Sequence, residues 1–329
     1  MSKQICDTQK VNRNNLIQIF RAFAIIAVVM IHTTPAGEWQ IYCRPFINFP
    51  VATFLFLSGY LTKATNTNWC SFFKRRISRV IIPYFIWTLL YSLPSVKING
   101  IEVLFRNLIT AEACGTLYYI FVYIQFVLLT PILIKLANSK YRNIGWIITP
   151  ISVLMFKYYP LLSGVDLNSI LSLIWGNSCL GWFTFYYIGL VLGNRIIEKD
   201  YSLKTLWFLY IISIAIQIIE GYSWYIGGVV NCGTQIKLTS ILTSTLFILC
   251  IYTILRQDKI RFENKFLQLL GDYSFGIYLC HIMIIWRIPY YTTIPYLINT
   301  VIVLSLSFIS CYIGSKICGT KISGWLGLK

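Results

Sequence analysis

The sequence carries little charge: only 12% of its 329 residues are charged, and just 11 of them are Asp or Glu. In soluble domains roughly a quarter of the residues are charged, whereas this chain is 57% apolar with a mean hydropathy of +0.67. This composition excludes a soluble globular protein. The ten cysteines contain no Cys-x-x-Cys pair, so we expect no metal site.

Acidic residues are too few to balance the basic ones, and the net charge is +17. A nucleic-acid-binding protein would gather its Lys and Arg residues on a water-exposed face. Here they occupy short gaps between apolar runs of roughly 15 to 20 residues, about the length that crosses the hydrocarbon core of a bilayer. We therefore expect no nucleic-acid partner, and the charge indicates membrane topology instead.

The apolar runs predict an all-α integral membrane protein, a bundle of about ten transmembrane helices. The predicted spans are residues 16–34, 46–62, 80–95, 116–136, 143–158, 179–196, 204–220, 236–255, 269–288 and 295–315. A competing apolar segment, 161–175, is assigned to an outer loop that could hold a re-entrant turn. Because no connection is long enough for a soluble domain, we expect one polytopic domain over residues 1–329.

The distribution of basic residues predicts the orientation of the chain. If the N-terminus is inside, most of the 28 Lys and Arg residues fall in cytoplasmic loops, as the positive-inside rule requires. An even number of spans returns the C-terminus to the same side. The sequence thus predicts a multi-pass protein of the cytoplasmic membrane, surrounded by lipid, with both termini cytoplasmic.

Two ionisable residues, Arg21 and His32, lie inside the first predicted span. Charged groups in spans cost several kcal/mol on insertion, so they are candidates for function. The two are eleven positions apart in the sequence, which places them on one helical face about 16 Å apart. Arg21 falls in the cytoplasmic half and His32 near the outer end. The alternative is that Arg21 only snorkels to the inner surface and His32 only lies at the interface.

The second of only two histidines is His281, in the ninth predicted span. Ser274 precedes it by seven residues and shares its helical face. A neutral imidazole is well suited to removing a hydroxyl proton near neutral pH. A lone buried histidine is more often a hydrogen-bonded structural group, so we predict a supporting role for His281.

A basic cluster, Lys74-Arg75-Arg76-Ile-Ser-Arg79, lies at the inner end of the third span. Arg76 and Arg79 are three residues apart and share a face, so their guanidinium groups could bind phosphate in a bidentate manner. Basic residues are also expected at a cytoplasmic helix end because of membrane topology and attraction to anionic lipid, even if no nucleotide binds there. The residues alone leave both interpretations open.

These segments together resemble the membrane acyltransferases of acyltransferase family 3, which include bacterial O-acetyltransferases of surface polysaccharides. The resemblance rests on Arg21 and His32 with ten residues between them, Arg76-Ile-Ser-Arg79 followed by Ile82-Pro-Tyr84, Ser274-Phe-Gly-Ile-Tyr-Leu-Cys-His281, and weaker matches at Phe54–Gly59 and Phe185–Gly189. The motifs occur in family order along nearly the whole chain. The sequence departs from the family at Ala22, where glycine commonly follows the arginine, and it lacks the soluble domain of some members.

The resemblance implies transfer of an acyl group, with acetyl expected, from cytoplasmic acyl-CoA to a hydroxyl of a saccharide or lipid-linked saccharide. It implies acyl-CoA as a co-substrate and no tightly bound cofactor. The expected roles are the catalytic pair His32 (general base) and Arg21, donor binding by Arg76, Arg79, Lys74 and Arg75, and supporting or acceptor-site roles for His281 and Ser274. The alternatives are an exporter or transporter of polysaccharides or small molecules, and a membrane protein that senses a small molecule or a lipid.

Four cysteines fall near the outer ends of predicted spans, where an oxidising compartment would permit disulfides. They are Cys43, Cys114, Cys179 and Cys232. A disulfide among them is a further hypothesis from the sequence.

Overall fold

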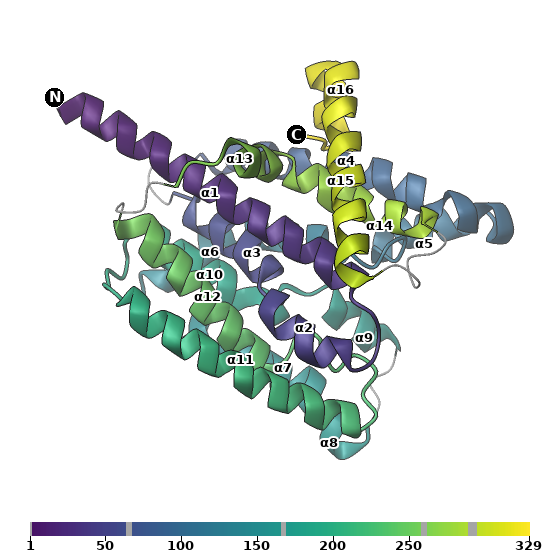
Figure 1. Ribbon diagram of the computed structural model, residues 1–329, viewed down its shortest axis with the longest axis horizontal. Coiled ribbons are helices and arrows are strands. Elements are labelled where there is room, and N and C mark those ends of the chain that lie inside the picture. Colours follow the sequence, from purple (N-terminus) through teal and green to yellow (C-terminus); the bar gives the residue numbers. More distant parts are fainter. Residues whose placement is uncertain (1, 64–67, 166–168, 258–261, 289–294) are drawn as a thin grey trace.

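The computed structural model describes residues 2–63, 68–165, 169–257, 262–288 and 295–329 (Figure 1). The regular elements of these segments are helices. They are α1 (Ser2–Thr33), α2 (Trp39–Ile47), α3 (Pro50–Tyr60), α4 (Trp69–Asn99), α5 (Glu102–Thr110), α6 (Tyr118–Ala137), α7 (Ile144–Val153), the π-helix η1 (Leu154–Tyr158), α8 (Tyr159–Ser163), α9 (Ser169–Gly176), the 3-10 helix η2 (Cys179–Trp182), α10 (Phe183–Gly193), α11 (Leu203–Ile226), α12 (Leu238–Gln257), α13 (Lys265–Asp272), α14 (Ser274–Arg287), α15 (Tyr296–Ile317) and α16 (Gly319–Trp325).

Eight helical segments of the described chain are long and apolar enough to cross a membrane. They are Asn15–Thr33, Trp39–Tyr60, Trp69–Asn99, Tyr118–Ala137, Ile144–Ser163, Leu203–Ile226, Leu238–Gln257 and Tyr296–Ile317. The pair α13 and α14, bent by 72°, would provide a ninth. The all-helical, multi-pass membrane architecture is therefore confirmed, whereas the count of ten and the cytoplasmic position of the termini stay predictions.

The predicted span 179–196 corresponds to η2 and α10. Helix α10 has only 11 residues and every one of them is buried, whereas a span needs about 20. Its apolar side chains pack against protein on all sides, and hydropathy alone cannot distinguish such a helix from one that faces lipid. In the competing segment 161–175, residues 161–163 end α8 and 169–175 lie in α9, while 166–168 are outside the described residues.

Helices α3 and α10 touch through their backbones. A Cβ atom on Gly189 would lie 2.1 Å from the Phe56 carbonyl oxygen, and one on Gly193 would lie 2.2 Å from that of Tyr60. The Gly-x-x-x-Gly spacing places both glycines on one face of α10, the pattern that brings membrane helices close together. This contact holds α10 directly against α3.

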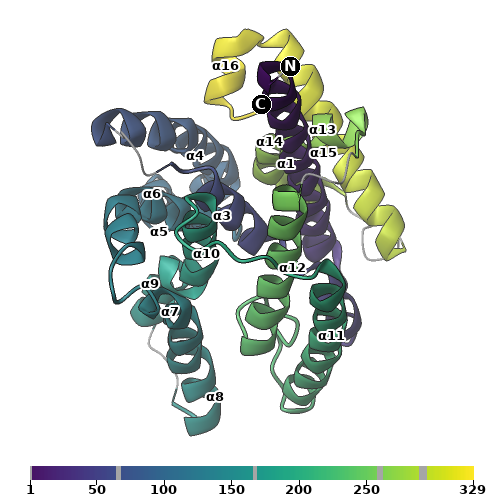
Figure 2. The same ribbon diagram turned by 90° about the vertical axis from the view of Figure 1, so that its left-hand side faces the viewer.

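Helix α1 runs between two groups of helices. Figure 2 shows α3 to α10 on one side and α11 to α15 on the other. Helix α1 contacts α3 of the first group and α12 to α15 of the second. Residues on α1 therefore contact side chains from both helix groups. Polar residues of α1 can thus lie beside residues that are distant in the sequence.

A buried ion pair ties α11 to the start of α12. Lys237 is 1% exposed, and its Nζ lies 3.9 Å from Oε2 of Glu220 and donates to the Cys232 carbonyl at 2.9 Å. The hydroxyls of Tyr158 and Thr239 each donate to a carboxylate oxygen of Glu220. Burial lowers the pKa of the Lys237 ammonium, and the charge of Glu220 opposes this shift. Each charge thus has its partner within the protein.

Candidate active site

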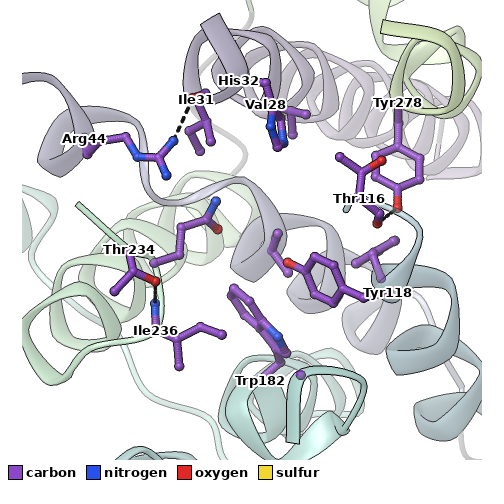
Figure 3. A pocket seen from close by; sticks show the side chains of 14 residues that line it. Val28, Ile31, His32, Arg44, Thr116, Tyr118, Trp182, Thr234, Ile236 and Tyr278 are labelled. Carbon is purple, nitrogen blue, oxygen red and sulfur yellow. Dashed lines mark hydrogen bonds between the residues drawn. The ribbon is translucent and has the colours of Figure 1, made fainter. Parts of the chain in front are cut away.

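A cavity of about 250 Å³ lies beside the C-terminal end of α1. Its walls come from both helix groups and include His32 of α1, Arg44 of α2, Tyr118 of α6, Trp182 of η2 and Gln235 from the loop before α12. Figure 3 shows His32, Arg44, Tyr118 and Trp182 arranged around this space. The cavity therefore combines aromatic surfaces with a few polar groups, as small-molecule sites do.

His32 occupies the last turn of α1. Its side chain is exposed, and the surface that it exposes borders the cavity. Within the described chain, neither ring nitrogen of His32 forms a hydrogen bond to protein. The imidazole thus borders the cavity with its ring nitrogens available to a substrate.

The second histidine lies directly against the first. The ring centroids of His32 and His281 are 5.2 Å apart, with the planes tilted by 52°. His281 is fully buried, and its Nδ1 lies 2.8 Å from the Tyr278 carbonyl oxygen and 3.1 Å from that of Ile277. Carbonyl oxygens only accept, so these partners assign the proton to Nδ1. Nε2 then carries the lone pair, and it is buried without a partner among the described residues.

The bend between α13 and α14 explains how His281 reaches this position. At Gly271, a Cβ atom would lie 2.0 Å from the carbonyl oxygen of Gln18. The absence of a side chain lets α13 pack directly on α1. After the 72° bend, α14 again contacts α1, further toward its C-terminal end. The glycine and the bend together bring the two histidines side by side.

Ser274 lies apart from the two histidines. It begins α14, about 10 Å along the helix axis from His281. Its hydroxyl is buried without a partner in the described part of the chain, and it is not among the residues that line the cavity. Ser274 shares a helical face with His281 but does not contact the space beside His32.

Arg21 also lies away from the cavity. Its Nη1 donates to Oε1 of Gln18 at 3.3 Å, and its charge is within electrostatic range of Tyr119, Asp272 and Tyr123. The rise of α1 separates Arg21 from His32 by about 16 Å. The two predicted catalytic residues therefore occupy opposite ends of one helical face.

Arg76 points into the protein. Its Nη1 donates to Oγ of Ser58 at 3.2 Å and to the hydroxyl of Tyr123 at 3.3 Å, and its Nη2 donates to Oγ1 of Thr62 at 3.2 Å. These partners belong to α3, to its C-terminal end and to α6. The guanidinium group thus joins α4 to two neighbouring segments.

The other basic residues of the predicted donor site face outward. Lys74, Arg75 and Arg79 are exposed, and none of them forms a protein hydrogen bond in the described segments. The cluster is therefore divided: Arg76 is partly buried and engaged, while the three exposed residues present free charge at the surface.

Tyrosines of α6 connect the two ends of the site. Tyr119 and Tyr123 are four residues apart, share a helical face and stack with ring centroids 6.4 Å apart. Tyr123 is bonded to Arg76, and Tyr119 lines the cavity that holds His32. Both tyrosines are only partly buried. They form a continuous row from the basic cluster to the cavity, with Arg21 beside it.

Arg44 is a site residue at a position where the sequence predicts an outer loop. It lies in α2, donates from Nη1 to the Ile31 carbonyl at 2.7 Å and from Nε to the Gly233 carbonyl at 3.3 Å, and borders the cavity with His32. The signal in the sequence is an arginine within the apolar run Ile41–Ile47, because intramembrane charges are rarely without function.

The family model described as an acyltransferase domain matches residues 14–316, nearly the whole chain. The chain belongs to this acyltransferase family. The resemblance stated from the sequence is confirmed, and so is the prediction of an enzyme that transfers groups other than amino-acyl groups. Neither the curated proteins nor the solved structures contain a significant match.

The cysteines of this acyltransferase do not form the disulfide considered from the sequence. Free thiols are found at Cys43, Cys114, Cys179 and Cys232. Across the described ranges, no group of three or more His, Cys, Asp or Glu side chains could hold a metal ion. The groups at the acyltransferase cavity are therefore imidazole, guanidinium, amide, hydroxyl and aromatic side chains, which suit proton transfer and charge stabilisation.

Proposed function

We propose that the acyltransferase moves an acyl group, with acetyl expected, from cytoplasmic acyl-CoA to a hydroxyl of a saccharide or lipid-linked saccharide at the cytoplasmic membrane. The observation that supports this most is His32: its ring nitrogens form no hydrogen bond to described residues, it borders the cavity, and its ring packs against that of His281. An imidazole so placed can act as a general base.

In the proposed reaction His32 accepts the proton of the acceptor hydroxyl. The hydroxyl oxygen attacks the thioester carbonyl carbon, and the carbonyl electron pair moves onto its oxygen. When the tetrahedral intermediate collapses, the C–S bond breaks and the CoA thiolate takes the proton from the His32 imidazolium. The products are the O-acyl ester and CoA with a free thiol, so no further reactant is needed.

His281 serves as a positioning residue in this proposal. Its Nδ1 proton is held by two backbone carbonyls, which leaves the Nε2 lone pair fixed in orientation. With ring centroids 5.2 Å apart, a small rotation of His32 would let one of its N–H groups donate to that lone pair. The other nitrogen of His32 would then be the base, as in catalytic sites where a second group selects the tautomer.

The proposed donor site begins at the exposed charges of Lys74, Arg75 and Arg79, which attract the CoA phosphates. Arg76 and the α6 tyrosines lead from there toward the cavity. Arg21 lies beside this route, where its charge would offset that of the donor. In the ten-span topology with cytoplasmic termini, the basic cluster faces the cytoplasm and His32 lies near the outer side.

Purified protein in detergent, supplied with radiolabelled acetyl-CoA, tests this proposal. We expect CoA release together with transfer of label to a saccharide acceptor. An exporter or transporter of the same fold would leave the thioester intact, so absence of thioester consumption with every acceptor offered would refute the proposed activity.

A further inference from the structure

Arg44 is a cation fixed beside the reacting groups. Its Nη1 donates to the Ile31 carbonyl at 2.7 Å, and Ile31 directly precedes His32. That carbonyl belongs to the last turn of α1, where carbonyl groups lack helical partners and the helix dipole is negative. The Nε of Arg44 donates to the Gly233 carbonyl at 3.3 Å. Two backbone contacts therefore hold the guanidinium group at the cavity.

The charge of Arg44 has no carboxylate to compensate it. Both of its hydrogen-bond acceptors are neutral carbonyls. None of the residues that line the cavity is Asp or Glu, and no ion pair of Arg44 occurs within the described segments. Arg44 is half-buried, and a cation partly removed from water without an anion is costly, so an arginine at this position indicates that an anion forms or binds there.

The donor phosphates do not fit this role. Their proposed site, at Arg76 and the exposed basic residues, is linked to the other end of the tyrosine row on α6. The group that must reach the cavity is instead the thioester, because His32 is there. Its carbonyl is neutral before attack and becomes an oxyanion in the tetrahedral intermediate.

We propose that Arg44 is a catalytic residue that stabilises this oxyanion. The inference rests on the proposed function. The Ile31 carbonyl anchors the guanidinium group to the helical turn that carries His32. The base and the positive charge therefore keep fixed positions relative to each other, and both can act on the thioester carbonyl. The interaction between Arg44 and the thioester oxygen strengthens only as negative charge develops on that oxygen. Arg44 would therefore stabilise the transition state more than the bound substrate, which lowers the activation barrier.

The test compares Arg44→Gln and Arg44→Lys with the wild type, by CoA release from acetyl-CoA with either water or methyl β-D-glucoside as the acceptor. Loss of an oxyanion-stabilising group lowers kcat by about 10²- to 10³-fold. We expect this loss in Arg44→Gln with the KM for acetyl-CoA little changed, and a smaller loss in Arg44→Lys. Because the same oxyanion forms with both acceptors, the loss should be equal for water and for the glucoside.

Asn48→Ala is the matched control for anchoring of the loop before α12. Asn48 donates from Nδ2 to the carbonyls of Gly233 at 3.0 Å and Thr234 at 3.4 Å but carries no charge. We expect a lower melting temperature with kcat within a few-fold of wild type. If Asn48→Ala reproduces the kcat loss of Arg44→Gln, Arg44 only anchors the loop and the proposal is wrong.

Other results would also overturn the proposal. A raised KM for the glucoside with unchanged kcat would assign Arg44 to acceptor binding, and normal kcat in Arg44→Gln would remove any catalytic role. If Arg44→Gln does not fold, a folded Arg44→Lys protein with unimpaired kcat overturns the requirement for the guanidinium group. A wild-type protein that releases no CoA refutes the proposed function itself, and the inference with it.

Discussion

Replacing His32 with alanine should abolish acyl transfer while leaving the fold and donor binding intact. The side chain borders the cavity and forms no hydrogen bond within the described chain, so its removal breaks none. No carboxylate lines the cavity, and His281 is buried with its Nδ1 engaged. The Nε2 of His281, unpaired among the described residues, is the nearest other base, but His281 is buried and does not line the cavity, so we expect it not to replace His32. Loss of a positioned base lowers the rate by about 10²- to 10⁴-fold, about 3 to 5 kcal/mol of barrier.

His281→Ala is the informative comparison. If His281 only orients the base, its removal should lower kcat by about tenfold, a loss of about 1.4 kcal/mol. It should also lower the melting temperature, because the ring is fully buried. The assay is CoA release under single-turnover conditions, with acetyl-CoA binding and thermal unfolding measured on the same preparations.

Two outcomes would refute this reasoning. An active His32→Ala protein together with an inactive but folded His281→Ala protein would reverse the two roles. If both variants keep normal turnover, histidine-based catalysis is wrong for this chain, which contains only two histidines.

Three further results are expected. Gly189→Ala should lower the melting temperature in detergent, because its Cβ meets the α3 backbone and overpacking costs about 1 to 3 kcal/mol, whereas Gly115→Ala, with open space around it, should not. Replacing both Arg76 and Arg79 with alanine should weaken acyl-CoA binding measured by titration, and lysine at both positions should restore it only in part. Unchanged affinity would mean that the basic cluster reflects membrane topology alone. A reporter active only outside the cytoplasm, fused after Lys329, should give no signal, and a strong signal would contradict the predicted orientation.

The sequence predicts the long helices well because their apolar runs are continuous. Residues 116–136 and 295–315, for example, correspond closely to α6 and α15. It overestimates α10, since a helix surrounded by protein has the same hydropathy as one surrounded by lipid. It also misses the bend of 72° between α13 and α14, because the apolar run 269–288 continues through the bend and Gly271 alone does not show how closely α13 packs on α1.

The candidate site is only partly readable from the sequence. Helical periodicity places Arg21 and His32 on one face, but it cannot show that His281, far along the chain, lies against His32. Arg44 falls between the predicted spans 16–34 and 46–62, and a rule based on loop charge cannot show that its side chain bonds to the end of α1. Contacts between distant segments, which hydropathy does not encode, decide both features.

The pairing of Glu220 with Lys237 has a consequence for biogenesis. Alone, α11 would carry an uncompensated carboxylate near its end, and the start of α12 an uncompensated ammonium. Since these two charges pair with each other and with no other charge in the described part of the chain, the two helices should leave the translocon together as one hairpin rather than one after the other. Truncation of nascent chains between Gly228 and Lys237 should therefore impair integration of α11, although its own hydropathy suffices for a span.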